Sequence, residues 1–138
     1  MQFHKGRLFD HVHLRTADLA ASERFYRAVI GAVNPVVEFR VTPHFFNADE
    51  LFVSPADGPA SRVHIAFQAP DHETVQRFHE AGLAAGGRDN GAPGPRGYHP
   101  GYYAAFLFDP DGHNVEAVYH GPAERSALSV VFTAPDDE

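Results

Sequence analysis

The sequence predicts an α+β domain built from two tandem βαβββ modules. Residues 11–32 align without a gap to residues 64–85, and the spacing between aligned positions is constant. Each copy begins with strand-like alternation and continues with apolar residues every three or four positions, the pattern of a strand followed by a helix. The identical pairs are His11 and His64, Asp18 and Asp71, Arg24 and Arg77, Phe25 and Phe78, Ala28 and Ala81, and Ala32 and Ala85. A pseudo-twofold duplication of this kind favours one shared site between its halves.

The first module spans about residues 8–54. Residues 8–16 alternate as a half-buried strand does, and Asp18 is a good N-cap for a helix that ends at Gly31. Three short strands follow at about 36–41, 44–47 and 51–54, separated by turn residues.

The second module spans about residues 62–120, after a Pro- and Gly-containing linker at 55–61. Asp71 caps its helix, which we expect over about 71–85. The stretch 90–101 is rich in Pro and Gly, so we expect an irregular loop over the site there. The predicted strands are 62–69, 103–108 and 114–119, and a tail at 121–138 could add an edge strand at 127–133.

Length and composition indicate one domain over residues 1–138, with a small molecule as its partner. The formal net charge of −7 argues against nucleic acid, whose phosphates it would repel. The chain has no Cys, which is compatible with the cytoplasm, and no apolar run long enough to cross a membrane. Its 12 Phe and 5 Tyr leave apolar surface to cover, so we also expect a homodimer.

Two segments resemble one known family. Residues 10–26, D-H-V-H-L-R-T-A-D-L-A-A-S-E-R-F-Y, look like the opening strand and helix of the vicinal oxygen chelate superfamily. Residues 108–118, F-D-P-D-G-H-N-V-E-A-V, resemble its closing hairpin. The superfamily includes glyoxalase I, extradiol dioxygenases, fosfomycin-modifying enzymes and bleomycin-resistance proteins. The resemblance covers about residues 8–120 and implies a curved mixed sheet around a cleft that holds a divalent metal.

The resemblance also implies the metal ligands. His11 stands at the family's first-strand ligand position, His64 at the equivalent position of the second module, and Glu116 at the carboxylate position of the last strand. Two imidazoles and a carboxylate suit one Fe, Mn, Ni, Co or Zn ion, and they leave coordination positions open for substrate and water.

The four-ligand pattern of glyoxalase I is incomplete in this chain. When the two closing hairpins are aligned, Ser54 stands opposite Glu116, so the first-half carboxylate is missing. A metal-bound carboxylate moves the substrate proton in glyoxalase-type isomerisation, and its loss favours dioxygenase-like or other open-site chemistry. Glu50 and His13 are the alternatives for an additional ligand.

Further site residues cluster around the loop at 90–101. We take Glu116, Tyr103 and His99 as candidates for catalysis, and Arg96, Tyr98, Tyr102 and His13 as candidates for substrate binding. Neighbouring strand residues point to opposite faces, so at most one of Tyr102 and Tyr103 reaches the cleft. The H-P-G-Y-Y-A-A-F stretch resembles a bacterial branch of the family described only as glyoxalase-like.

Two functions therefore compete. The first is a metal-dependent lyase, isomerase or dioxygenase acting on a small oxygenated substrate that chelates the metal. The second is a metal-free binding protein of the bleomycin-resistance kind, which holds an aromatic or cationic antibiotic among its rings. The metal content of the purified protein separates them.

Overall fold

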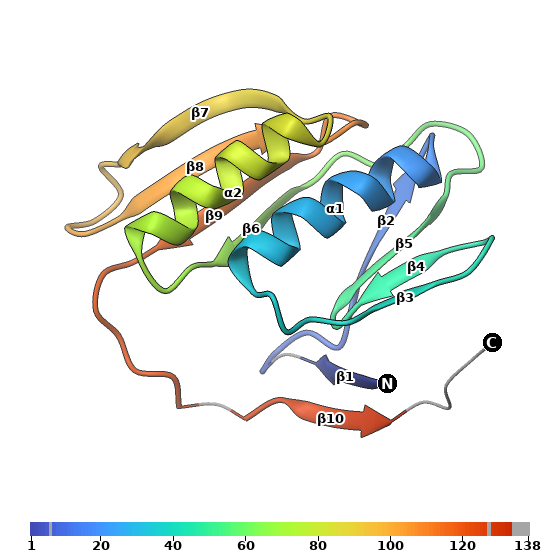
Figure 1. The fold of residues 1–138 in the computed structure, drawn as a ribbon, viewed down its shortest axis with the longest axis horizontal. Helices are drawn as coiled ribbons and strands as arrows, with labels where there is room; N and C mark the ends of the chain where they lie inside the picture. The colour runs from blue at the N-terminus through green and yellow to red at the C-terminus, as the bar shows by residue number, and fades with distance from the viewer. Residues whose placement is uncertain (6, 127, 134–138) are drawn as a thin grey trace.

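Two four-stranded sheets, one from each half of the chain, organise this protein (Figure 1). The computed structural model describes residues 1–5, 7–126 and 128–133, and all structural statements refer to them. Each half has the order strand, helix and three strands, and both sheets are mixed. The α+β class and the two βαβββ modules are thereby confirmed, but each module keeps a sheet of its own.

The first module contains β2 (Val12–Thr16), α1 (Leu19–Val33), β3 (Phe39–Val41), β4 (Phe46–Ala48) and β5 (Leu51–Pro55). Its strand order is β2-β5-β4-β3, with β2 parallel to β5 and the other pairs antiparallel. β2 is therefore an edge strand.

The second module repeats this arrangement with β6 (His64–Gln68), α2 (His72–Ala84), β7 (Arg88–Pro95), β8 (Tyr103–Phe108) and β9 (Asn114–Tyr119). Its order is β6-β9-β8-β7, and β6 runs parallel to β9. β6 is the edge strand that corresponds to β2.

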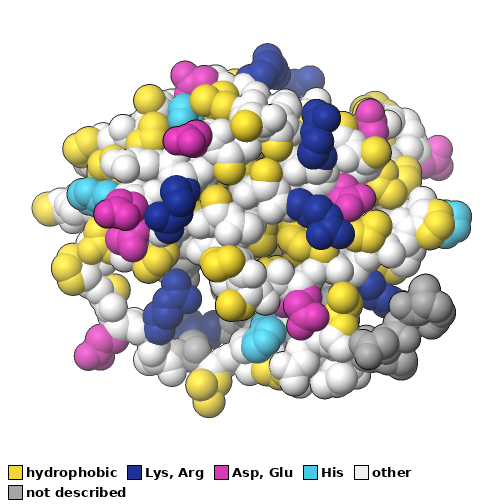
Figure 2. Space-filling model, in the orientation of Figure 1, with side chains coloured by type: hydrophobic (Ala, Val, Ile, Leu, Met, Phe, Trp, Pro, Cys, Tyr) yellow, Lys and Arg dark blue, Asp and Glu magenta, His cyan; other side chains and the backbone are white. Residues whose placement is uncertain are grey.

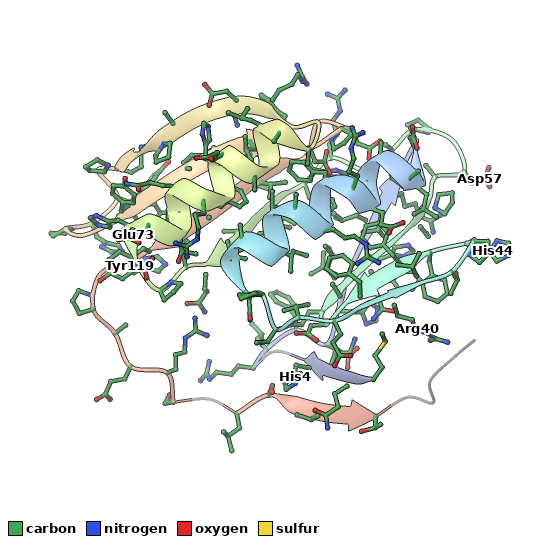
Figure 3. All side chains as sticks on the ribbon, in the orientation of Figure 1. His4, Arg40, His44, Asp57, Glu73 and Tyr119 are labelled. Atoms are coloured by element: carbon green, nitrogen blue, oxygen red, sulfur yellow. The ribbon has the colours of Figure 1, made fainter. Side chains whose placement is uncertain are left out.

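A separate two-stranded ribbon joins the two ends of the chain. β1 (Gln2–Lys5), which the sequence pattern did not predict, pairs antiparallel with β10 (Val130–Thr133). The backbone N–H of His4 donates to Asp49 Oδ1 at 2.9 Å, which ties the ribbon to the β4–β5 turn (His4 in Figure 3). β10 lies inside the predicted 127–133 strand, whose first residue, Ala127, is outside the described residues.

Both helices begin where their capping residues predict. Asp18 accepts a hydrogen bond from Ala21 N–H and Asp71 accepts one from Thr74 N–H, so each carboxylate satisfies a first-turn donor. α1 continues two residues beyond the predicted end at Gly31, because Val33 packs against the core and so extends the apolar face.

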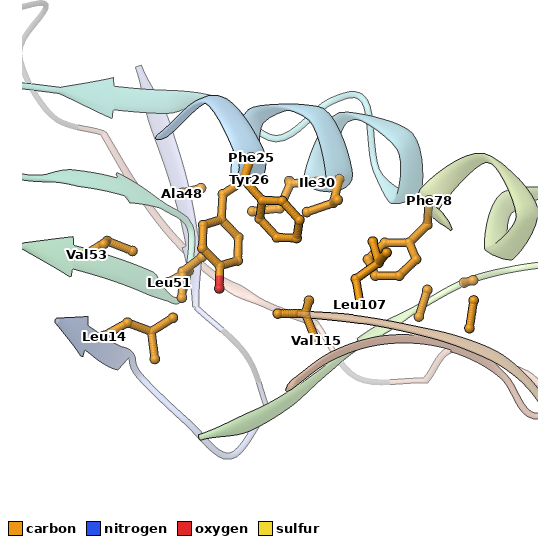
Figure 4. Close-up of a cluster of buried hydrophobic side chains, with 14 of the residues drawn as sticks. Leu14, Phe25, Tyr26, Ile30, Ala48, Leu51, Val53, Phe78, Leu107 and Val115 are labelled. Carbon is orange, nitrogen blue, oxygen red and sulfur yellow. The ribbon is translucent and has the colours of Figure 1, made fainter. Parts of the chain in front are cut away.

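One continuous core lies between the helices and the sheets (Figure 4). Figure 1 shows α1 and α2 side by side on one face of the molecule. At their crossing Gly82 lets the helices approach, since a Cβ there would lie 2.9 Å from Val29 Cγ1 and 2.2 Å from Leu107 Cδ1. The helix face seen in Figure 2 mixes Lys and Arg with Asp and Glu, without a large patch of one sign.

The predicted loop at 90–101 is wrong in its first half. β7 extends to Pro95 and pairs with β8 through two register shifts, at Asp89/Gly91 and Gly91/Gly94. These irregularities accommodate the Gly and Pro residues that argued against a strand, so the tertiary pairing overrides the local preference. Only the tip between β7 and β8 is irregular. Neither helix in the described part of the chain is long and apolar enough to cross a membrane.

Candidate metal centre

Glu116 and His64 form the centre of the candidate site. Glu116 lies in β9 and is only 2% exposed. Its Oε1 atom lies 2.8 Å from Nε2 of His64, at the start of β6. Because a carboxylate oxygen accepts, His64 donates through Nε2. The second carboxylate oxygen, Oε2, accepts from the hydroxyl of Tyr102. The structure thus brings a predicted metal-ligand pair together on β6 and β9.

The first module holds a matching pair, but with His13 rather than His11. His64 faces Asn114 across the parallel strands and bonds to the side chain two residues further along, Glu116. In the same way His13 faces Phe52 across β2 and β5, and its Nε2 lies 2.7 Å from Oγ of the residue two positions further on, Ser54. By strand pairing, His13 is therefore the counterpart of His64, and Ser54 is the counterpart of Glu116.

The surroundings of His13 favour its neutral form, which is the form that binds metals. Burial, and after it the positive charge of Arg15, lowers the pKa of His13 below its ordinary value, which favours the neutral imidazole that metals bind. The edge of its ring packs against Phe52 at a centroid distance of 4.8 Å.

His11 lies outside the strand, one residue before β2. Its Nδ1 is 2.8 Å from Asp10 Oδ1, and its side chain is 57% exposed. This hydrogen bond is the main reason why the pKa of Asp10 is below its ordinary value. In the described part of the chain, no third His, Asp or Glu atom joins those of His64 and Glu116 in a group whose members all lie within 4.8 Å of one another.

The two adjacent tyrosines point to opposite faces of the second sheet. Tyr102 bonds to Glu116, and burial followed by this hydrogen bond raises the pKa of Tyr102 to about 12, so it remains a donor at neutral pH. Tyr103 instead stacks on His72 at 3.8 Å and accepts from Gln76 Nε2 at 3.0 Å, so it faces α2. The structure places Tyr102 at the site and Tyr103 against the helix.

Tyr98 and His99 surround Tyr102 together with a residue that the sequence pattern missed. The rings of Tyr98, His99 and His120 meet the Tyr102 ring edge-on, at centroid distances of 4.9, 5.3 and 5.2 Å. His99 Nε2 lies 2.9 Å from His120 Nδ1. His120 arrives there because Tyr103 pairs with Tyr119, which places the residues before and after them side by side; Figure 3 shows Tyr119 at that end of the sheet. No local motif signals it.

The guanidinium of Arg96 bonds to the backbone of its own hairpin. It donates to the backbone carbonyls of Ala92 at 2.8 Å, Gly94 at 2.9 Å and Pro95 at 3.2 Å. It also lies 5.4 Å from the centre of the Phe106 ring. These contacts hold the irregular end of β7 in shape.

A cavity of about 970 Å³ opens beside β6 and includes His64 in its wall. It lies between the end of α1, the β4–β5 turn and residues 7–9, and much of its lining is apolar, with Ile30, Val33, Val37, Leu51, Ile65 and Phe67. Glu50 lines it too, and burial raises the pKa of that carboxyl group. Of the pair formed by His64 and Glu116, His64 is the residue that lines the cavity.

Sequence comparison identifies the family. A family model described as the Glyoxalase/Bleomycin resistance protein/Dioxygenase superfamily matches residues 8–117. The chain belongs to this superfamily. No curated protein sequence matches the chain.

Solved structures of the superfamily share the fold. A glyoxalase/bleomycin resistance protein from Albidiferax ferrireducens is 28% identical, with a TM-score of 0.67 over 80% of this chain and 97% of its own. A glyoxalase-related enzyme from Fulvimarina pelagi is 24% identical, with a TM-score of 0.66 over 94% and 99% of the two chains. Lactoylglutathione lyase from Agrobacterium tumefaciens is 23% identical, with a TM-score of 0.59 over 82% and 93%.

The chemistry of Glu116 and His64 fits the divalent metal that the superfamily commonly uses. Glu116 is a buried carboxylate with one histidine and one tyrosine on it, so a cation would compensate its charge. Its Oε1 atom and His64 Nε2 are 2.8 Å apart, close to the separation of neighbouring donors bound at about 2.1 Å to one octahedral ion.

A second group of metal-binding side chains, Asp109, Asp111 and His113, lies at the β8–β9 turn. Its atoms are already engaged. Asp109 Oδ2 accepts from Tyr26 at 2.6 Å and from His113 Nδ1 at 2.7 Å. Burial alone would raise the pKa of Asp109, but the hydrogen bonds from His113 and Tyr26 outweigh it and hold that pKa below its ordinary value.

Asp111 and His113 join this turn to the junction of β2 and α1 and to the linker between the modules. Asp111 accepts from Thr16 Oγ1 at 2.5 Å and from Ala17 N–H at 2.8 Å, and His113 Nε2 lies 2.7 Å from Ser61 Oγ. We therefore describe the group as a clasp between the modules, with its donors and acceptors satisfied by protein.

Proposed function

We propose that this protein is a divalent-metal-dependent enzyme that acts on a small oxygenated substrate. The convergence of His64 Nε2 and Glu116 Oε1, 2.8 Å apart on β6 and β9, carries the proposal. When bound, the metal supplies Lewis-acid chemistry, polarising adjacent oxygens of the substrate or activating dioxygen. Fe, Mn, Ni, Co and Zn all suit imidazole and carboxylate donors.

The chain's own residues hold and surround that centre. His64 and Glu116 supply two donors, and His64 belongs to the wall of the 970 Å³ cavity through which a substrate reaches them. The rings of Tyr98, Tyr102 and His99 build one border of the site, where we place substrate contacts. Ser54 stands where a first-module carboxylate would, so a metal-bound base is missing and dioxygenase-like or other open-site chemistry is favoured over glyoxalase-type isomerisation.

The third ligand comes from the first module. His11 is the candidate from the family pattern, and His13 is the candidate from strand pairing with Ser54. Since neither joins His64 and Glu116 within this chain, we propose that a second copy supplies it in a homodimer. β2 and β6 are both edge strands, and the apolar Leu8 and Phe9 at the cavity are 80% and 63% exposed, which supports such pairing.

Metal analysis and titration test the proposal. Protein purified without a nickel-affinity tag or chelator should contain one divalent ion per chain. After chelator treatment it should bind Mn(II), Co(II), Ni(II) or Zn(II) in a calorimeter, and Glu116→Gln should abolish or strongly weaken this binding. Comparison of His11→Gln with His13→Gln identifies the third ligand, because metal binding should weaken only when the ligating histidine is replaced. Equal binding by wild type and Glu116→Gln would overturn the proposed site.

A metal-free binding protein is the second candidate. The exposed rings at the β7–β8 tip favour it, since Tyr98 is 74% exposed and could take an aromatic or cationic antibiotic. Absence of metal binding by the wild type, together with tyrosine fluorescence changes on adding bleomycin, would support this function in place of the enzyme.

A further inference from the structure

Glu116 presents its two oxygens to different partners. Oε1 accepts a hydrogen bond from His64, whereas Oε2 accepts one from the hydroxyl of Tyr102. Since Glu116 is buried, water does not compete freely for either oxygen. The hydrogen bond from Tyr102 therefore fixes the orientation of the carboxylate, with Oε1 directed at His64.

Both the carbonyl and the N–H group of the Tyr102 backbone form hydrogen bonds. Arg96 N–H donates to the Tyr102 carbonyl at 2.9 Å, and Tyr102 N–H donates to the His99 carbonyl at 3.2 Å. The guanidinium of Arg96 closes the same tip by bonding to three carbonyls of β7. The hairpin tip is thus a structured support for one side chain.

The half-buried ring of Tyr102 also packs against other rings. Tyr98, His99 and His120 contact it edge-on, and the last two are hydrogen-bonded to each other. His99 Nδ1 donates to the carbonyl of Pro100 at 2.8 Å, so its Nε2 accepts from His120 Nδ1 when both rings are neutral. This support keeps the hydroxyl of Tyr102 directed at Glu116.

We propose that Tyr102 is a positioning residue that reserves Glu116 Oε2 and leaves only Oε1 for the metal, which makes Glu116 a monodentate ligand. The inference rests on the proposed function and specifies its coordination. Hydrogen bonds to metal ligands orient them and change metal affinity by about 10- to 100-fold when they are removed. Monodentate binding by Glu116 also keeps one more coordination position available to substrate.

The test uses Co(II) as the probe, because its visible absorption weakens as its coordination number rises. Tyr102→Phe keeps the ring and removes only the hydroxyl, so Oε2 becomes free to bind. We expect a weaker Co(II) band and an affinity lower by about 10-fold or more. Tyr103→Phe is the matched control, since it removes the neighbouring hydroxyl, which bonds to Gln76 on the opposite face, and it should leave the band unchanged.

A second measurement requires no change at Tyr102. The infrared difference spectrum between Co(II)-loaded wild type and metal-free Glu116→Gln should show the widely split carboxylate stretches of monodentate coordination. Closely spaced stretches of a bidentate carboxylate, or a Tyr102→Phe band identical to wild type, would overturn the inference and leave the proposed function standing. Failure of the wild type to bind Co(II) would overturn both.

Discussion

His13 bonds to Ser54 in the first module as His64 bonds to Glu116 in the second. The two nitrogen-to-oxygen distances are 2.7 and 2.8 Å, and each oxygen belongs to the residue two positions beyond the strand partner of its histidine. By strand pairing, both modules carry a histidine at this position, but only the second module carries a carboxylate opposite it.

Restoring that carboxylate should strengthen metal binding. Ser54→Glu places a second carboxylate beside His13, and we expect Co(II) affinity to rise about tenfold, equivalent to about 1.4 kcal/mol, in a calorimetric titration. Ser129→Glu is the control, because Ser129 also bonds to a histidine, His4, but in the β1–β10 ribbon. An equal gain in both variants would show only a general effect of negative charge.

Metal binding should break the hydrogen bond between His64 and Glu116. His64 donates through Nε2 to Glu116 in the free chain, so a metal at that nitrogen requires the imidazole to carry its proton on Nδ1 instead. The nitrogen-15 chemical shifts of the His64 ring, measured with and without Zn(II), report this change of tautomer. His64→Gln should abolish the metal binding, whereas shifts that keep the proton on Nε2 in the metal-bound protein would exclude Nε2 as the metal donor.

Asp109→Asn should destabilise the fold strongly. Asp109 is buried and accepts from both Tyr26 and His113, so losing its charge should cost about 3 kcal/mol of unfolding free energy at pH 7, measured with urea. Asp57→Asn, in the exposed loop after β5 (Figure 3), is the control and should change stability by less than about 0.5 kcal/mol.

The effect of Asp109 should disappear in acid. Because its pKa is lower in the folded than in the unfolded chain, its stabilisation is complete above the unfolded value of about 4 and is lost as the pH falls through the folded value. The stability difference between wild type and Asp109→Asn should therefore shrink below about pH 4. A difference that stays constant down to pH 2 would contradict the role of the charge.

A pair of glycine variants tests the helix crossing. Gly82→Ala would place a Cβ 2.2 Å from Leu107 Cδ1, and we expect a loss of about 1–3 kcal/mol from overpacking. Gly31→Ala meets nothing within 4 Å on α1 and should stabilise the protein by about 0.5–1 kcal/mol through helix propensity. Urea unfolding measures the change in the free energy of unfolding, which should be negative for Gly82→Ala and positive for Gly31→Ala. Destabilisation by both would point to a general intolerance of Ala in these helices.

The sequence by itself determined the features that depend on neighbouring residues. The repeat and the capping residues Asp18 and Asp71 predicted both helices, and the predicted strands 103–108 and 114–119 have the bounds found in β8 and β9. Periodicity, capping and the turn at 109–112 are local signals, so neighbouring residues alone were enough to predict these elements.

Tertiary structure alone decided which histidine pairs with which side chain. His11 and His13 differ by two residues, and strand side chains alternate with a period of two, so the hydrophobic pattern is the same for either choice. The pairing of β2 with β5 makes the decision by joining His13 to a residue far along the chain. In the same way, the pairing of β8 with β9 brings His120 beside Tyr102, and the pairing of β7 with β8 imposes a strand on Gly- and Pro-rich sequence. These contacts are non-local, and only packing between distant segments selects their register.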